Sequence, residues 1–95
     1  MSAENPGDIA RISSQLTVFF GFCKGHHQAD EKSFQELHRE LMKRGEAAGG
    51  ESFVEMLSTE LSRRAREFRA DGAEFWCSRM QERIRKTPYN KVFKA

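Results

Sequence analysis

Apolar residues recur at helical spacing in the first part of the chain. Steps of three and four residues separate five of them: Ile9, Ile12, Leu16, Phe19 and Cys23. This spacing places all five on one face of a helix. The helix begins near Asn5 and Pro6 or at Asp8, because Asn or Asp can cap a helix and Pro suits the first helical turn. Thr17–Phe20 is also typical of a strand, but a lone strand would have no partner. We therefore predict a helix over residues 6–23.

A second helix is predicted over residues 31–44, after a loop at 24–29. It begins at Asp30 or at Ser33, because Ser33 and Glu36 have the spacing of a capping box. Its apolar positions are Phe34, Leu37, Leu41 and Met42. The glycine-rich segment 45–50 is expected to end this helix in a flexible turn.

The longest apolar pattern predicts a third helix over residues 52–86. Ser52 and Glu55 again have capping-box spacing, and Pro88 stops the helix. One side carries Val54, Leu57, Leu61, Ala65, Phe68, Gly72, Trp76, Met80 and Ile84. These eight steps cover 30 residues, or about 3.75 residues per step, whereas a left-handed coiled coil repeats every 3.5. Gly72 could divide the helix into 52–70 and 73–86, but the pattern keeps its phase there, so we expect continuity.

These elements predict an all-α fold in which residues 1–95 form a single domain of three helices. Two shorter helices pack on one long C-terminal helix, and the tail 87–95 packs back through Tyr89 and Phe93. The long helix would extend about 52 Å, more than the shorter helices cover easily. A small domain gains stability by oligomerisation, so we expect a homodimer through the long helix.

Charge is distributed unevenly along the chain. Residues 63–95 hold ten basic and four acidic residues, a net charge of +6, and residues 1–62 hold six and ten, a net charge of −4. An arginine-rich helix can lie along phosphates, so nucleic-acid binding is an alternative function. Its candidate residues are Arg63, Arg66, Arg79, Arg83 and Lys86. Interspersed acidic residues such as Glu67 and Glu82 would repel a phosphate backbone. Glu60 and Arg64 are spaced as a solvent-exposed helical ion pair.

No residue pattern predicts a catalytic centre, a cofactor site or a metal site. Cys23, His26 and His27 lie close together, but a structural zinc site needs four ligands and no second close pair exists. A Cys–His nucleophile pair would need a third orienting group and a cleft. We expect Cys23 and Cys77 to be free thiols in a cytoplasmic protein, with neither a signal peptide nor a membrane span.

The function expected from this sequence is therefore non-catalytic. We predict a small regulator or inhibitor that sequesters another protein, for example a transcription regulator, through an apolar helix face. Trp, Phe and Met are enriched where interfaces lose water. The candidate partner-binding residues are Phe53, Leu57, Leu61, Phe68, Phe75, Trp76, Met80, Tyr89 and Phe93.

Overall fold

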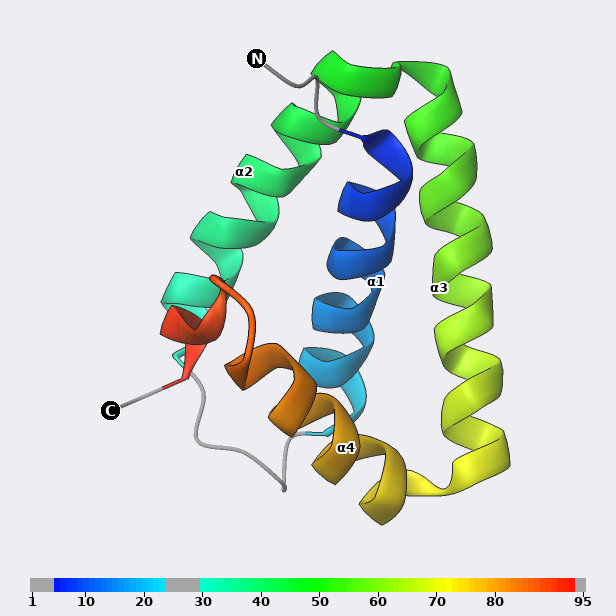
Figure 1. The fold of residues 1–95 in the computed structure, drawn as a ribbon, viewed down its shortest axis with the longest axis vertical. Coiled ribbons are helices and arrows are strands. Elements are labelled where there is room, and N and C mark those ends of the chain that lie inside the picture. Colours follow the sequence, from blue (N-terminus) through cyan, green and yellow to red (C-terminus); the bar gives the residue numbers. More distant parts are fainter. Residues whose placement is uncertain (1–4, 24–29, 94–95) are drawn as a thin grey trace.

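The chain folds into helices arranged around a central one (Figure 1). The structure, a computed structural model, describes residues 5–23 and 30–93. Its elements are α1 (Pro6–Phe22), α2 (Glu31–Gly49), α3 (Glu51–Asp71), α4 (Ala73–Arg85) and the short 3₁₀ helix η1 (Asn90–Val92). α1 lies between α2 and α3, and α4 crosses the half of α1 near its C-terminal end (Figure 1). The all-α prediction is confirmed, but these residues form four α-helices rather than three.

Side chains that accept backbone hydrogen bonds set the starts of α1 and α2. The Asn5 side chain accepts a hydrogen bond from the Gly7 amide at 2.8 Å, and Pro6 follows it, as predicted. Asp30 caps α2 by accepting from the amides of Lys32 and Ser33. Of the two predicted starts, Asp30 is therefore correct. Ser33 lies inside the first turn, where its hydroxyl donates to the Asp30 carboxylate.

The connection between α2 and α3 is much tighter than predicted. α2 does not end at residue 44 but continues to Gly49, and α3 begins at Glu51. Gly50 alone turns the chain, with a positive φ of 56° that favours glycine. Because Gly50 occupies the cap position, Ser52 falls within the first turn of α3, and no side chain makes a capping bond there. The predicted capping box at Ser52 is wrong.

The predicted helix 52–86 is also wrong, because the chain breaks at Gly72. Gly72 has φ 87° and ψ 152°; its amide donates to the Phe68 carbonyl, and its own carbonyl accepts from the Trp76 amide. One glycine therefore ends α3 and begins α4. A continuous helix would extend about 52 Å, whereas the 17 residues of α1 span about 26 Å. Turning at Gly72 lets the apolar face of α4 return to α1, which a straight helix could not do.

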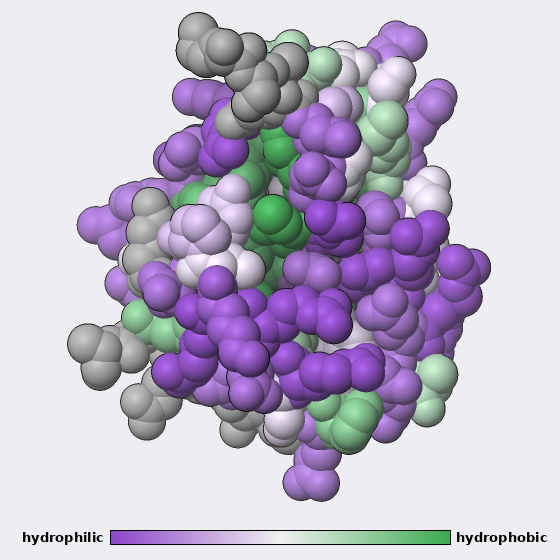
Figure 2. All heavy atoms as spheres, viewed as in Figure 1, coloured by the Kyte–Doolittle hydropathy of each residue, from purple (hydrophilic) through white to green (hydrophobic). Residues whose placement is uncertain are grey.

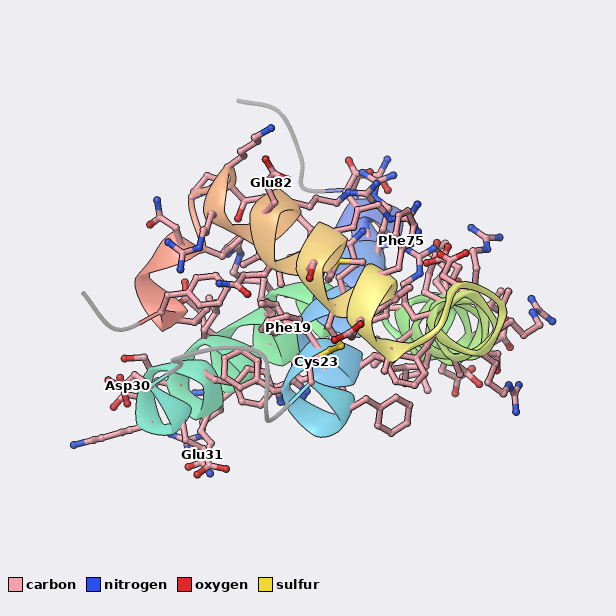
Figure 3. The ribbon with its side chains drawn as sticks, turned by 90° about the horizontal axis from the view of Figure 1, so that it is seen from below. Phe19, Cys23, Asp30, Glu31, Phe75 and Glu82 are labelled. Carbon is pink, nitrogen blue, oxygen red and sulfur yellow. A yellow bond between two sulfur atoms is a disulfide. The ribbon has the colours of Figure 1, made fainter. Side chains whose placement is uncertain are left out.

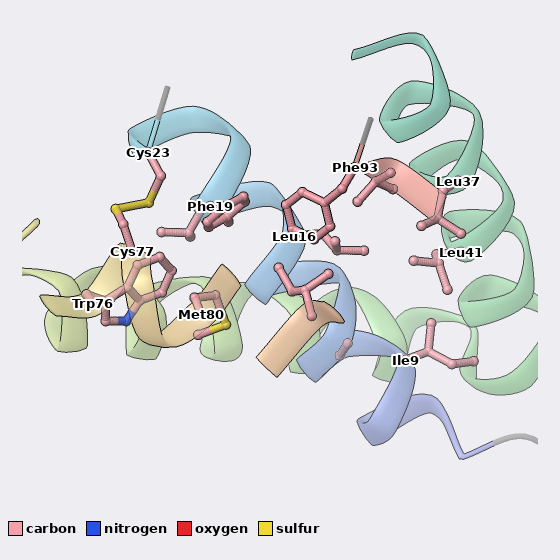
Figure 4. Close-up of a cluster of buried hydrophobic side chains, with 14 of the residues drawn as sticks. Ile9, Leu16, Phe19, Cys23, Leu37, Leu41, Trp76, Cys77, Met80 and Phe93 are labelled. Atoms are coloured by element: carbon pink, nitrogen blue, oxygen red, sulfur yellow. A yellow bond between two sulfur atoms is a disulfide. The ribbon is translucent and has the colours of Figure 1, made fainter. Parts of the chain in front are cut away.

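The hydrophobic core surrounds α1 and receives side chains from every other element. Leu16 and Phe19 of α1 lie between α4 on one side and α2 with η1 on the other, and Cys23 follows the end of α1 beside α4 (Figure 4). The core also includes Leu37, Leu41, Phe53, Trp76, Met80, Ile84, Val92 and Phe93. The Phe93 ring meets Phe19 edge-on at 5.8 Å, and the Asp30 amide donates to the Val92 carbonyl. The tail therefore packs back on the domain, as predicted.

Cys23 and Cys77 form a disulfide that joins the end of α1 to α4 (Figures 3 and 4). The prediction of two free thiols is wrong. The two residues are 54 positions apart in the sequence, and neither belongs to a recognised disulfide spacing. They meet only because Gly72 turns α4 back across α1. Both cysteines are fully buried, next to Phe19 and Trp76 in the core.

A candidate protein-binding groove

Most of the predicted partner-binding residues belong to the core. Phe53, Trp76, Met80 and Phe93 are buried. Four more are partly buried and pack against the core: Leu57, Leu61, Phe68 and Tyr89. Only Phe75 is largely exposed, on the outer side of the first turn of α4 (Figure 3). The fold itself thus covers most of the apolar pattern that predicts a partner.

Exposed large apolar side chains remain at a few positions of the described chain. Phe22 is 55% exposed and Phe75 59%, and Val54 and Met56 are exposed as well. Phe22 is not among the predicted binding residues, because its spacing only widens the α1 pattern. Phe22 follows Phe19 by three residues, so its phase places it on the flank of the buried α1 face, about 60° around the helix from Phe19. Spacing alone does not show that this flank stays uncovered, because that depends on how α3 packs beside α1.

Phe22 forms one wall of a groove between the end of α1 and the second half of α3. Gly21, Phe22, Ala65, Phe68 and Arg69 line this hollow, which has a volume of about 540 Å³ and is open to solvent. The rings of Phe22 and Phe68 are tilted against each other with centroids 5.1 Å apart. Gly21 and Ala65 carry little side-chain bulk, which leaves space beside the two rings. We call this hollow the α1–α3 groove.

Contacts around the groove hold its aromatic wall in place. Phe68 meets Trp76 edge-on with centroids 5.6 Å apart, so a buried residue of α4 supports the groove wall. Trp76 is followed by Cys77, and the disulfide leads from there to Cys23, the residue after Phe22. Three helices are therefore joined in a closed ring of two aromatic contacts and one covalent bond. Such a preformed wall loses little side-chain freedom when a ligand binds.

The acidic side chains of α3 near this groove, Glu60, Glu67 and Asp71, bind partners outside the groove. Arg64 is almost fully buried and pairs with Glu60 at 3.1 Å and Glu67 at 3.4 Å. Glu67 also accepts a hydrogen bond from the Trp76 indole, so its carboxylate faces α4. This cluster corrects the prediction of a solvated Glu60–Arg64 pair. Asp71 pairs with Arg79 of α4.

Arg69 lies on the other side of α3, about 200° around the helix from Glu67. Arg66 is exposed one turn before it. Neither arginine has an ion-pair partner among residues 5–23 and 30–93. The groove therefore combines an apolar wall with uncompensated positive charge at its edge.

The arginines and lysine predicted for nucleic-acid binding do not form one free basic surface. Arg63 pairs with Glu60, Arg79 with Asp71 and Lys86 with Glu82. Arg66 and Arg83 lack such partners in the described part of the chain, but they stand on different helices. The face that carries α4 is mostly hydrophilic, with a narrow hydrophobic hollow near its centre (Figure 2). Paired acids would weaken attraction to a phosphate backbone.

Among the described residues, those considered for metal or nucleophile chemistry do not come together. Cys23 is bonded to Cys77 and offers no thiolate. His38 lies against the Phe34 ring, and His26 and His27 fall outside the described residues. Within the described ranges, no three acidic, histidine or cysteine residues are grouped as metal ligands would be. None of the described helices combines the length and the apolar character that crossing a membrane requires.

Comparisons with protein-family models, with characterised proteins and with solved structures found no match to this chain.

Proposed function

We propose that this chain is a small, non-catalytic regulatory protein that sequesters or inhibits another protein by binding one of its segments in the α1–α3 groove. The observation that carries the proposal is the exposed Phe22 beside Phe68 in a hollow of about 540 Å³. Exposed aromatic side chains around a concave surface are typical of sites that bind a protein segment.

The open form of the groove favours a protein segment over a small molecule. Small-molecule sites usually enclose most of their ligand. Here the wall is one ring from α1 and one from α3, and the hollow is open to solvent. A helix or an extended segment can lie along such a surface and bury one side while the other stays hydrated.

Phe75 supports a binding role less well than Phe22 does, although both rings are equally exposed. The Arg79 guanidinium lies over the Phe75 ring at 5.0 Å from its centroid, and Arg79 also pairs with Asp71. One face of that ring is thus already in contact with its own helix. Phe75 does not line the α1–α3 groove, so it serves as a matched control for Phe22.

A homodimer remains a prediction, and its expected surface changes. The long apolar face that suggested self-association is divided between α3 and α4 and is largely part of the core. If two copies associate, we expect them to meet at the α1–α3 groove, where the exposed Phe22 lies beside Phe68. Sedimentation of the purified chain over a concentration series would measure this, and a groove variant would test the surface.

The disulfide changes the expected cellular compartment. The prediction of a cytoplasmic protein depended partly on free thiols. Structural disulfides persist in oxidising compartments and are rare in the cytosol. The Cys23–Cys77 bond therefore favours a protein that works where disulfides form.

The proposal is tested by selecting helical peptides from a display library on the folded, oxidised chain. We expect selected peptides to bind the Phe22→Ser variant about tenfold or more weakly, because the substitution removes an aromatic wall of the groove. The Phe75→Ser variant, which loses an equally exposed ring, should retain wild-type affinity. Fluorescence anisotropy with labelled peptides measures both. Equal binding by wild type and Phe22→Ser would overturn the proposal.

A further inference from the structure

We infer that the segment bound in the α1–α3 groove is an acidic amphipathic helix. This inference rests on the proposed function, and it adds the chemistry of the partner. Three features of the groove lead to it: an apolar strip that continues along α3, space for a large side chain beside Phe22, and positive charge on one edge.

The apolar strip follows α3 beyond the groove itself. Val54, Leu61, Ala65 and Phe68 occur at helical spacing, and each retains some solvent exposure. From Val54 to Phe68 the strip covers 15 residues, or about 21 Å of helix. Ser58 and Ser62, which lie beside it, are small and uncharged. A partner helix of about four turns could lie along this strip. The exposed Glu51 and Glu55 flank its Val54 end, so the positive edge is confined to the end near Phe22.

The groove has room for one large apolar anchor at the Phe22 end. The small residues Gly21 and Ala65 line it together with the two aromatic residues, and a Cβ placed on Gly21 would have no neighbour within 4 Å. A leucine or phenylalanine of the partner could therefore contact the Phe22 and Phe68 rings. Anchors at positions i, i+3 or i+4, and i+7 are the usual spacing for a helix bound in a groove.

Charge decides which amphipathic helix fits. Arg69 lines the groove, and Arg66 stands one turn before it. The nearby acids Glu60 and Glu67 are engaged with the buried Arg64, so they do not neutralise this edge. Arginine forms paired hydrogen bonds with carboxylates, and complementary charge suppresses the wrong partner. A helix with glutamates flanking its apolar anchors would match this edge, whereas one with lysines would be repelled.

The test uses three synthetic peptides of about 16 residues with identical leucine and phenylalanine anchors. Their flanking positions carry glutamate in the first, glutamine in the second and lysine in the third. We expect the glutamate peptide to bind the full-length, oxidised chain about tenfold more tightly than the glutamine peptide, and the lysine peptide to bind most weakly. Added salt should reduce this difference. Fluorescence anisotropy gives the three affinities.

Variants then assign the charge preference to the groove. Exchanging both arginines in the Arg66→Glu/Arg69→Glu variant should reverse the preference toward the lysine peptide. Arg83→Glu is the matched control, because Arg83 also lacks an ion-pair partner among the described residues but lies on α4. It should keep the wild-type order of affinities.

The outcomes separate this inference from the proposed function. If the three peptides bind equally and all lose affinity in Phe22→Ser, the groove binds helices but the acidic partner is wrong. If no peptide binds in a way that depends on Phe22, both the helix-binding groove and the acidic partner are wrong. A reversed order in the double arginine variant, with Arg83→Glu unchanged, supports the acidic helix directly.

Discussion

Gly45 shows how one missing side chain determines where an aromatic ring can be buried. A Cβ atom built on Gly45 of α2 would overlap the Phe53 ring of α3. Phe53 is therefore buried against the bare backbone of the neighbouring helix. Spacing along residues 52–86 places Phe53 off the main apolar line, which suggested a partner for it. The cover comes instead from a glycine that the sequence pattern assigned to a flexible turn.

We predict that Gly45→Ala destabilises the domain by about 2 kcal/mol, although alanine favours helices. The propensity gain of about 1 kcal/mol is smaller than the cost of forcing the Phe53 ring out of its position. Gly21→Ala is the matched control, because Gly21 is also helical but faces open space. It should leave stability unchanged or raise it by up to about 1 kcal/mol. Urea unfolding measures both, and a stabilised Gly45→Ala would contradict the packing described.

At the scale of elements, local signals predict most helices and fail where tertiary contacts decide. The apolar spacing and the Asn5 cap predict α1 almost to its last residue. The capping boxes at Ser33 and Ser52 fail because Asp30 and Gly50 occupy the cap positions instead. The phase that seemed to continue across Gly72 is not the phase of burial: α3 buries Phe53 rather than Val54, whereas α4 buries Trp76, Met80 and Ile84 of the predicted line. The break at Gly72 is determined by the packing of α4 on α1, a tertiary contact that local spacing does not contain.

We predict that Gly72→Ala destabilises the domain by about 1–3 kcal/mol. The backbone at Gly72, with φ 87° and ψ 152°, belongs to a region that is essentially restricted to glycine. Straightening α3 into α4 would relieve the strain but remove Trp76 and Met80 from the core. D-Alanine at position 72, introduced by chemical synthesis, is the control, because its mirror-image preference suits a positive φ. Thermal unfolding should rank glycine and D-alanine above L-alanine, and equal stability of the two alanine forms would refute the argument.

At the scale of the whole molecule, the candidate site depends on contacts that no local pattern contains. The α1–α3 groove uses Phe22, Phe68 and Arg69, and the sequence pattern selected only Phe68 for partner binding. Phe22 becomes significant once α3 lies beside α1, and Arg69 once the acids of α3 are seen to turn toward Arg64 and Trp76. The pairing of Cys23 with Cys77 likewise follows from the turn at Gly72. Periodicity can identify a buried face, but it cannot tell which exposed residues from separate helices meet.

The Cys23–Cys77 disulfide supports both the fold and the groove. A crosslink between residues 54 positions apart limits the unfolded chain and contributes about 4 kcal/mol in the chain-entropy model. A domain of this size has a total stability of about 5–14 kcal/mol, so the loss would be a large fraction. Because both cysteines are buried, the chain should be reduced in denaturant and then refolded.

We expect the reduced chain and a Cys23→Ser/Cys77→Ser variant to unfold at clearly lower urea concentration than the oxidised chain. Reductant should lower the midpoint of the wild type and leave that of the variant unchanged. If thiol titration shows full reduction while the midpoint stays where it was, the crosslink contributes nothing to stability. Reduction should also weaken peptide binding in the groove. Phe22 adjoins Cys23, and Phe68 contacts Trp76, which precedes Cys77. Hydrogen exchange on the reduced chain would locate that loosening at the end of α1 and the start of α4.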